Sequence, residues 1–136
     1  LNLINIVVAG IAGISLVVGG IGIANTMYTS ILERRKEIGV MKAIGAKNSD
    51  ITWIFLIESG LLGLVGGIIG AVIGLSFAFL GAQLANQALG QSLFKVSISY
   101  TLVFGSILFS FAVGTISGVL PAIQASKTNV LDALRS

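Results

Sequence analysis

Residues 59–80 read SGLLGLVGGIIGAVIGLSFAFL and contain no charged side chain. A helix rises about 1.5 Å per residue, and crossing the hydrocarbon core of a bilayer takes roughly 20 apolar residues. This stretch is therefore long enough to span a membrane as one helix. Its apolar residues are continuous and do not alternate with polar ones, which favours a helix over a strand of a transmembrane barrel.

Two further stretches, residues 1–32 and 96–126, are also free of charged residues. The chain of 136 residues is 55% hydrophobic and only 10% charged, whereas soluble domains carry about a quarter charged residues. A chain this short cannot hide so many apolar side chains from water. The sequence therefore predicts an all-α integral membrane protein. Its three transmembrane helices are expected over about residues 3–30, 51–84 and 100–123, the last ending near Pro121, which cannot extend a helical hydrogen-bond ladder.

The composition excludes several classes of function. The chain has no Cys and no His, so disulfides and thiolate nucleophiles are absent, and the usual ligands of zinc and haem are missing. The net charge of +3 does not indicate a nucleic-acid partner, because the basic residues interleave with acidic and apolar ones and form no stripe.

The positions of the basic residues predict the orientation. In membrane proteins Lys and Arg collect in the cytoplasmic segments. The segment between the first two helices and the C-terminal tail would together hold every basic residue except Lys95. We therefore expect a multi-pass protein of the cell (plasma or inner) membrane, with the N-terminus of this chain outside and the C-terminus in the cytoplasm. The cytoplasmic basic residues would be Arg34, Arg35, Lys36, Lys42, Lys47, Lys127 and Arg135.

Small residues recur at helical spacing in the second and third apolar stretches. Such rows let helix backbones approach closely inside a bilayer. Two explanations stay open, namely packing of these helices on one another and contact with a second membrane subunit. The rows are Gly66, Gly70 and Gly74, with Gly63 and Gly67 beside them, and Ser110, Gly114 and Gly118 in the third stretch.

Residues 33–46, between the first two membrane helices, are too long for a simple turn. Ile38, Met41 and Ile44 lie three residues apart and form a short apolar stripe. Gly45 is a natural C-terminal stop for this helix, and any one of Asn48, Ser49 or Asp50 could cap the helix that follows. The segment is predicted to contain a short amphipathic helix.

Two interpretations of this amphipathic helix are open. It could lie on the lipid headgroups, with Arg34, Arg35 and Lys36 on anionic lipid. Alternatively, its interspersed acidic residues and glycines suit docking of a cytosolic protein.

Glu58 is the only acidic residue between Asp50 and Asp132. A carboxylate in mid-membrane would indicate proton translocation, as in the proteolipid subunits of rotary ATPases. However, Glu58 follows Asp50 by only about 12 Å along a helix. We therefore expect Glu58 near the cytoplasmic interface, in a structural or coupling role, within reach of Lys42, Lys47 or a partner.

The run at residues 33–47, ERRKEIGVMKAIGAK, resembles the signature of the FtsX-like permease family. This family includes the macrolide-exporter (MacB-type) and lipoprotein-releasing ABC transporter permeases. Residues 51–59, the glycine-rich helix and the closing residues 121–135 are similar too, so the resemblance covers essentially the whole chain. One departure is Asn129, where the closing motif commonly has Pro.

The resemblance implies four transmembrane helices, with a large extracytoplasmic domain between the first two. The three helices here would be the last three, without the upstream helix and domain. Residues 33–46 would contain a coupling helix seated on an ABC ATPase, on a separate subunit or a fused domain. The residues expected to dock the ATPase are Glu33, Arg34, Arg35, Glu37, Ile38, Met41, Lys42, Gly45 and Ala46.

The same resemblance implies the function. ATP hydrolysis in the cytoplasm would move the extracytoplasmic domain, for export or extraction of a substrate, with a second copy or a paralogue completing a dimer. The chain itself is expected to bind no cofactor and to be no enzyme, since no lysine follows a glycine as a phosphate-binding loop requires. ATP and Mg²⁺ would bind the partner ATPase. The alternatives are a signalling module that activates a cell-wall hydrolase and, more remotely, a proton-translocating proteolipid.

Overall fold

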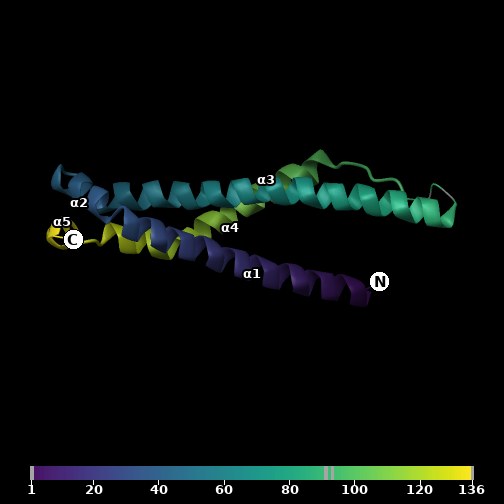
Figure 1. Cartoon of the computed structure of the whole chain (residues 1–136), viewed down its shortest axis with the longest axis horizontal. Coiled ribbons are helices and arrows are strands. Elements are labelled where there is room, and N and C mark those ends of the chain that lie inside the picture. The colour runs from purple at the N-terminus through teal and green to yellow at the C-terminus, as the bar shows by residue number, and fades with distance from the viewer. Residues whose placement is uncertain (1, 91, 93, 136) are drawn as a thin grey trace.

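The computed structural model describes residues 2–90, 92 and 94–135, and these residues form five helices (Figure 1). Three of the helices are long and apolar enough to cross a membrane, which confirms the predicted all-α membrane fold. The helices are α1 (Asn2–Glu33), α2 (Arg35–Ala43), α3 (Asn48–Leu89), α4 (Tyr100–Ser126) and α5 (Val130–Arg135).

The long helices extend beyond the bounds expected from the sequence. α3 has 42 residues, so it is about 63 Å long and must project from a bilayer. α4 continues through Pro121 to Ser126, so the expected end near Pro121 is wrong. A proline removes only its own N–H from the hydrogen-bond ladder, and such a residue is tolerated in membrane helices where neighbouring helices pack around it. Pro121 is fully buried against those neighbours.

The helices are arranged as a crossing pair with a third helix beside it. α3 and α4 make the most extensive contact, and α1 lies mainly against α4 (Figure 1). The N-terminal part of α1 diverges from the other helices, and its residues 2–19 are all exposed. α2 and α5 pack on each other at the opposite end of the molecule.

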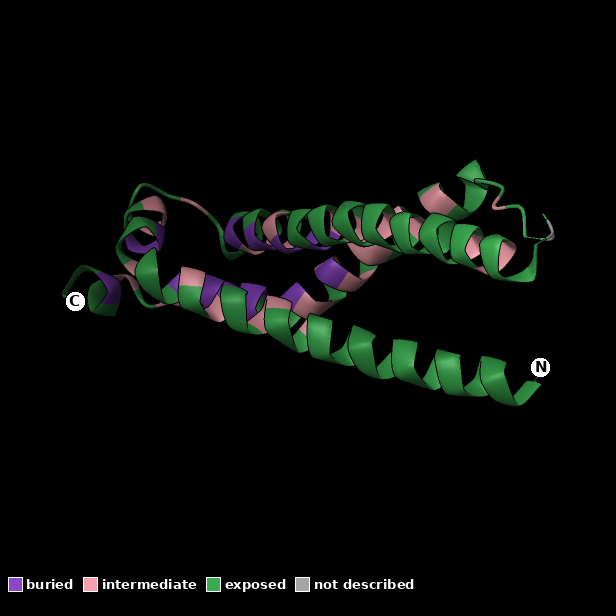
Figure 2. Cartoon of the chain, turned by 45° about the vertical axis from the view of Figure 1, so that its right-hand side comes forward, coloured by how far each residue is buried: buried purple, intermediate pink, exposed green. Residues whose placement is uncertain are grey.

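The buried core lies at the end that carries α2 and α5, not in the middle of the long helices (Figure 2). Elsewhere the large apolar side chains point outward, as expected of surfaces that face lipid or another membrane protein. One end of the molecule is therefore held together by its own side chains. The core residues are Met27, Ile31, Ile38, Ile51, Phe55, Ala122 and Ala125.

α3 and α4 meet backbone to backbone where two glycines face each other. A methyl group placed on Gly63 would lie 2.9 Å from the Cα of Gly114, and one placed on Gly114 would lie 2.8 Å from the Cα of Gly63. On either side of this point Ser59 lies against Gly118, and Gly67 lies against Ser110. The small residues expected on the third membrane helix thus lie at this contact.

The row Gly66, Gly70 and Gly74 is not part of the contact. A methyl group added to any of these three glycines would meet nothing within 4 Å in the described part of the chain, apart from the adjoining residues and backbone of its own helix. The glycines of α3 that pack against α4 are instead Gly63 and Gly67, on the neighbouring row. Gly66 lines a cavity described below, and contact of this row with a second membrane subunit stays a prediction.

Candidate functional site

The site is the end of the molecule formed by α2, the α2–α3 turn, the C-terminal end of α4, and α5, which we call the α2 end. α2 follows α1 with a break only at Arg34. The backbone N–H of Arg34 donates to the carbonyl of Ser30, and the N–H of Ile38 donates to the carbonyl of Arg34, both at 3.0 Å. The hydrogen-bond ladder therefore links the membrane helix α1 directly to α2.

α2 ends in a Schellman motif at Gly45. The N–H of Ala46 donates to the carbonyl of Met41 at 3.0 Å, and the N–H of Gly45 donates to that of Lys42 at 3.1 Å. This motif requires a left-handed residue after the helix, and Gly45 has φ +109°. The predicted stop at Gly45 is confirmed.

The N-cap of the next helix, α3, is Lys47, so none of the three candidates from the sequence occupies that position, and Asp50 contributes from the third residue of the helix. Its carboxylate Oδ2 accepts a hydrogen bond from the backbone N–H of Lys47 at 3.0 Å. An acidic side chain here also meets the positive end of the helix dipole. A turn of only a few residues thus connects α2 to the second membrane helix.

The inner face of α2 packs into the protein. Ile38 is fully buried, and Met41 packs against the core at the α2 end. Gly39 lies against Ala133 of α5, so closely that a methyl group on Gly39 would come within 2.7 Å of the Ala133 Cβ. Ile38 and Met41, which the sequence suggested as docking residues, therefore hold α2 in place.

Lys42 also points inward. Its Nζ donates to the carbonyl of Ser126, the last residue of α4, and at 2.8 Å to the carbonyl of Thr128 in the turn that follows. The last carbonyls of a helix have no partner within the helix. Lys42 therefore caps the C-terminal end of α4.

The outer face of α2 carries a mixed surface. Lys36 and Glu37 are exposed, and Val40 and Ile44 are exposed apolar residues, with Ile44 at 82%. The sequence placed Ile44 on one stripe with Ile38, but steps of three residues drift by about 60° each, so Ile44 is turned about 120° from Ile38. We call Lys36, Glu37, Val40 and Ile44 the outer face of α2.

The remaining residues suggested for docking lie at the two ends of α2. Glu33 and Arg34 are exposed before α2 and Gly45 after it, and Arg35 and Ala46 are half-buried. The Nη1 of Arg34 lies 3.3 Å from the Oε2 of Glu58 on α3. The ion partner of Glu58 is thus Arg34 and neither of the two lysines considered from the sequence. Pairing with Arg34, the residue that follows α1, puts Glu58 near the end of the membrane helices.

Sequence reasoning missed the short helix α5. Its signal was Asn129, whose Oδ1 accepts a hydrogen bond from the N–H of Leu131 at 3.2 Å, together with Asp132 in the first turn. Asn before a helix and an acid in its first turn are typical start signals. Asn129, noted above only as a departure from the closing motif of the family, is therefore the cap of α5.

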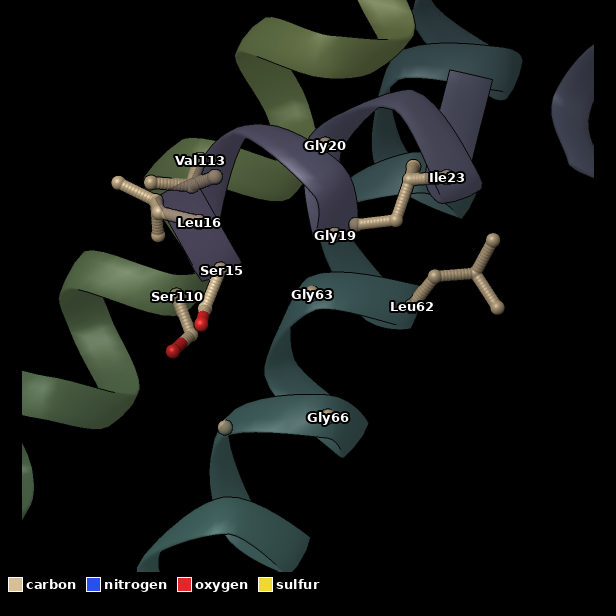
Figure 3. A pocket seen from close by; sticks show the side chains of 11 residues that line it. Ser15, Leu16, Gly19, Gly20, Ile23, Leu62, Gly63, Gly66, Ser110 and Val113 are labelled. Atoms are coloured by element: carbon tan, nitrogen blue, oxygen red, sulfur yellow. The ribbon is translucent and has the colours of Figure 1, made fainter. Parts of the chain in front are cut away.

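A cavity of about 320 Å³ lies between α1, α3 and α4, away from the α2 end (Figure 3). Glycines of α1 and α3 form much of its wall, and the hydroxyls of Ser15 and Ser110 lie near each other at one side. The Ser15 hydroxyl donates to the carbonyl of Ile11 within its own helix. The wall is otherwise apolar, so this cavity suits a hydrocarbon chain or another helix better than a polar substrate.

Within residues 2–90, 92 and 94–135, no three acidic, Cys or His side chains gather as metal ligands would.

Three apolar helices, with a short helix packed at one end between the first two, define a multi-pass integral membrane domain. Residues 9–130 match the family described as FtsX-like permease C-terminal, and the chain belongs to this family. The resemblance recognised in residues 33–47 is confirmed.

Curated relatives agree with this family. The chain is 50% identical over 135 residues to an uncharacterized ABC transporter permease of Methanocaldococcus jannaschii, with 99% of this chain and 34% of the relative covered. It is 43% identical over 129 residues to the uncharacterized ABC transporter permease YknZ of Bacillus subtilis (95% and 31% covered). It is 44% identical over 131 residues to the macrolide export ATP-binding/permease protein MacB of Psychrobacter cryohalolentis (96% and 19% covered). The chain thus spans about a third or less of the length of these relatives.

Proposed function

We propose that this chain is the membrane part of an ABC transporter permease that couples ATP hydrolysis in the cytoplasm to motion of an extracytoplasmic domain, for export or extraction of a substrate. The observation that carries this proposal is the placement of α2. It joins two membrane helices, is anchored by a fully buried Ile38, and presents an outer face that nothing in the described chain covers.

The outer face of α2 has the character of a protein-docking surface. Val40 and Ile44 offer apolar area, while Lys36 and Glu37 place opposite charges beside it. Protein interfaces combine an apolar centre with a polar rim in this way. A helix that rests on anionic headgroups instead tends to carry basic residues on its polar face, with its apolar side toward the lipid. On α2 the acidic Glu37 lies beside Lys36 on the exposed face, so this face is not uniformly basic, which favours a protein partner.

The connection from α2 to the membrane helices supports transmission of force. The backbone ladder continues from α1 into α2, and the buried residues at the α2 end come from α1, α2, α3 and α4. Packed interiors transmit displacement because they compress little. A push on α2 is therefore expected to reach all three membrane helices.

The partners follow from this mechanism. An ABC ATPase, on a separate subunit or a fused domain, would bind ATP and Mg²⁺ and contact the outer face of α2. The MacB relative is named as an ATP-binding/permease protein, which supports such a pairing. A second copy of the permease or a paralogue would complete the dimer, and the uncovered row Gly66, Gly70 and Gly74 is a surface available for it. The basic residues at the α2 end favour the cytoplasmic side for this end.

Charge reversal on α2 tests docking against the lipid alternative. Glu37→Lys adds a basic residue and Lys36→Glu removes one, and each basic residue near an anionic membrane contributes about 1 kcal/mol of attraction. If α2 docks an ATPase, both reversals and Ile44→Ala should reduce co-purification of the ATPase with the full-length permease, measured at equal expression together with ATP turnover.

The lipid alternative predicts a different pattern for the same variants. Glu37→Lys and Lys36→Glu would then have opposite effects on adsorption to anionic vesicles, and neither variant would affect the ATPase. Retention and normal activity of the ATPase in all three variants would refute the proposed role of α2.

A further inference from the structure

We propose that Lys42 is a positioning residue that ties the coupling helix α2 to the C-terminal end of α4 and to α5, so that these three elements move as one unit. The proposal rests on the function proposed above for α2. It adds a residue whose task is to hold the docking helix on the third membrane helix, rather than to contact the ATPase.

The chemistry of the contact supports this role. Lys42 and Ser126 are 84 positions apart in the sequence, so no local geometry brings them together. The ammonium group offers three donors, and it meets the carbonyl of Ser126 at the negative end of the α4 dipole and that of Thr128 just beyond the helix. Hydrogen bonds from a charged donor are about twice as strong as neutral ones. Half-buried surroundings reduce the competition from water at this point.

A steric contact lies next to the polar one. Gly39 is on the same side of α2, and its missing side chain leaves the space that Ala133 fills. Ala133 is fully buried, although α5 has only six residues. Asn129 caps the start of α5 and so fixes its direction as it leaves α4. α5 is thus held between the end of α4 and the inner face of α2.

These two contacts give α4 a direct link to α2. α1 and α3 are joined to α2 through the chain itself, by the break at Arg34 and by the short turn at Gly45. α4 has no such covalent connection. Lys42 provides the connection by hydrogen bonds, which explains why a basic residue on a docking helix points away from the outer face.

The experiment measures amide hydrogen exchange in the full-length permease, with and without its ATPase. The test variant is Lys42→Met, which keeps the length of the side chain and removes the charge and the donors. Lys47→Met, at an exposed lysine that follows α2 and lies outside its outer face, is the matched control. Lys42→Arg keeps charge and donors and should restore most of the wild-type behaviour.

Without the ATPase, Lys42→Met should speed exchange at the end of α4 and in residues 130–135 by about tenfold or more, as expected for loss of hydrogen bonds from a charged donor. Lys47→Met should leave these rates unchanged. With the ATPase bound, wild-type permease should gain protection in α2 and also in α5, and in Lys42→Met only the protection of α2 should remain.

The outcomes separate this proposal from the one it rests on. If the ATPase protects no amides of α2 in the wild type, the docking function fails. If α2 is protected but the protection of α5 is absent, or is the same in Lys42→Met, the link through Lys42 is refuted while docking stands. Unchanged exchange of residues 130–135 in Lys42→Met without the ATPase also refutes it.

Discussion

Adding a single methyl group at Gly63 should separate α3 from α4. In the structure this group would lie 2.9 Å from the Cα of Gly114 and 3.1 Å from its backbone N. Carbon atoms pack best at about 3.5–4.0 Å, so the helices would have to move apart by roughly 0.6–1.1 Å. The carbonyl oxygen of Ser110 lies nearer still, and all three obstructing atoms belong to the backbone and cannot rotate away.

The expected cost is that of overpacking, about 1–3 kcal/mol. Gly→Ala within a helix also gains about 0.8–1.0 kcal/mol of helix propensity. A control variant with the same gain is therefore needed. Gly81→Ala provides it, because Gly81 lies in the same helix, outside the row proposed for dimer contact, and a methyl group there would meet no other part of the described chain within 4 Å.

The assay is thermal unfolding of the full-length permease in mild detergent, followed by far-ultraviolet circular dichroism. Gly63→Ala should unfold at a lower temperature than Gly81→Ala, by roughly 2–4 °C for each kcal/mol of packing lost. Gly114→Ala should behave like Gly63→Ala because its methyl group would lie 2.8 Å from the Gly63 Cα. Equal unfolding temperatures for Gly63→Ala and Gly81→Ala would refute the backbone contact.

Three other predictions follow from the α2 end and the orientation. A cysteine replacing Lys127 should resist an impermeant thiol reagent added to intact cells, while one replacing Gln87 should react; the reverse labelling would invert the orientation. The ion pair between Arg34 and Glu58 is half exposed, so a double-mutant cycle on unfolding free energy with Arg34→Gln and Glu58→Gln should give a coupling below about 1 kcal/mol. A larger coupling would show that the pair is desolvated in the membrane. Asn129→Ala should remove the cap of α5 at a cost of about 0.5–2 kcal/mol, seen as faster amide exchange confined to residues 130–135, and unchanged exchange would show that packing alone holds α5.

The sequence was sufficient for the fold because membrane spans depend on a property that does not need tertiary structure. Uninterrupted apolar length predicts a spanning helix wherever that helix packs. Gly45 was equally readable, since a left-handed residue at a helix end is a local requirement. Helix ends were less predictable, as Pro121 shows, because burial against neighbouring helices decides whether a helix continues past a proline.

The candidate site was harder to predict because the direction of each side chain depends on contacts between distant segments. Lys42 looks in the sequence like a solvent-facing or docking lysine. Its carbonyl partners lie beyond residue 125, in a part of the chain for which no helix α5 had been expected. Ile38 and Met41 were correctly seen as apolar, but an apolar stripe on a short helix fits an internal core and an external partner equally well. Only the position of α4 and α5 decides between these two.

By contrast, the sequence did indicate which of the two glycine rows of α3 contacts α4. Ile51 and Phe55 begin the part of α3 that packs into the core, and they lie four residues apart. Continued by fours, this row passes through Ser59 and reaches Gly63, and the positions on it as far as residue 75 are all buried or half-buried. Rows of this spacing are the ridges that helices commonly pack into each other's grooves. Gly70 precedes the row by one residue and is therefore turned by about 100° from it. The rotation of α3 is thus determined by the apolar residues at its start, and that rotation decides which glycines meet α4 and which remain uncovered.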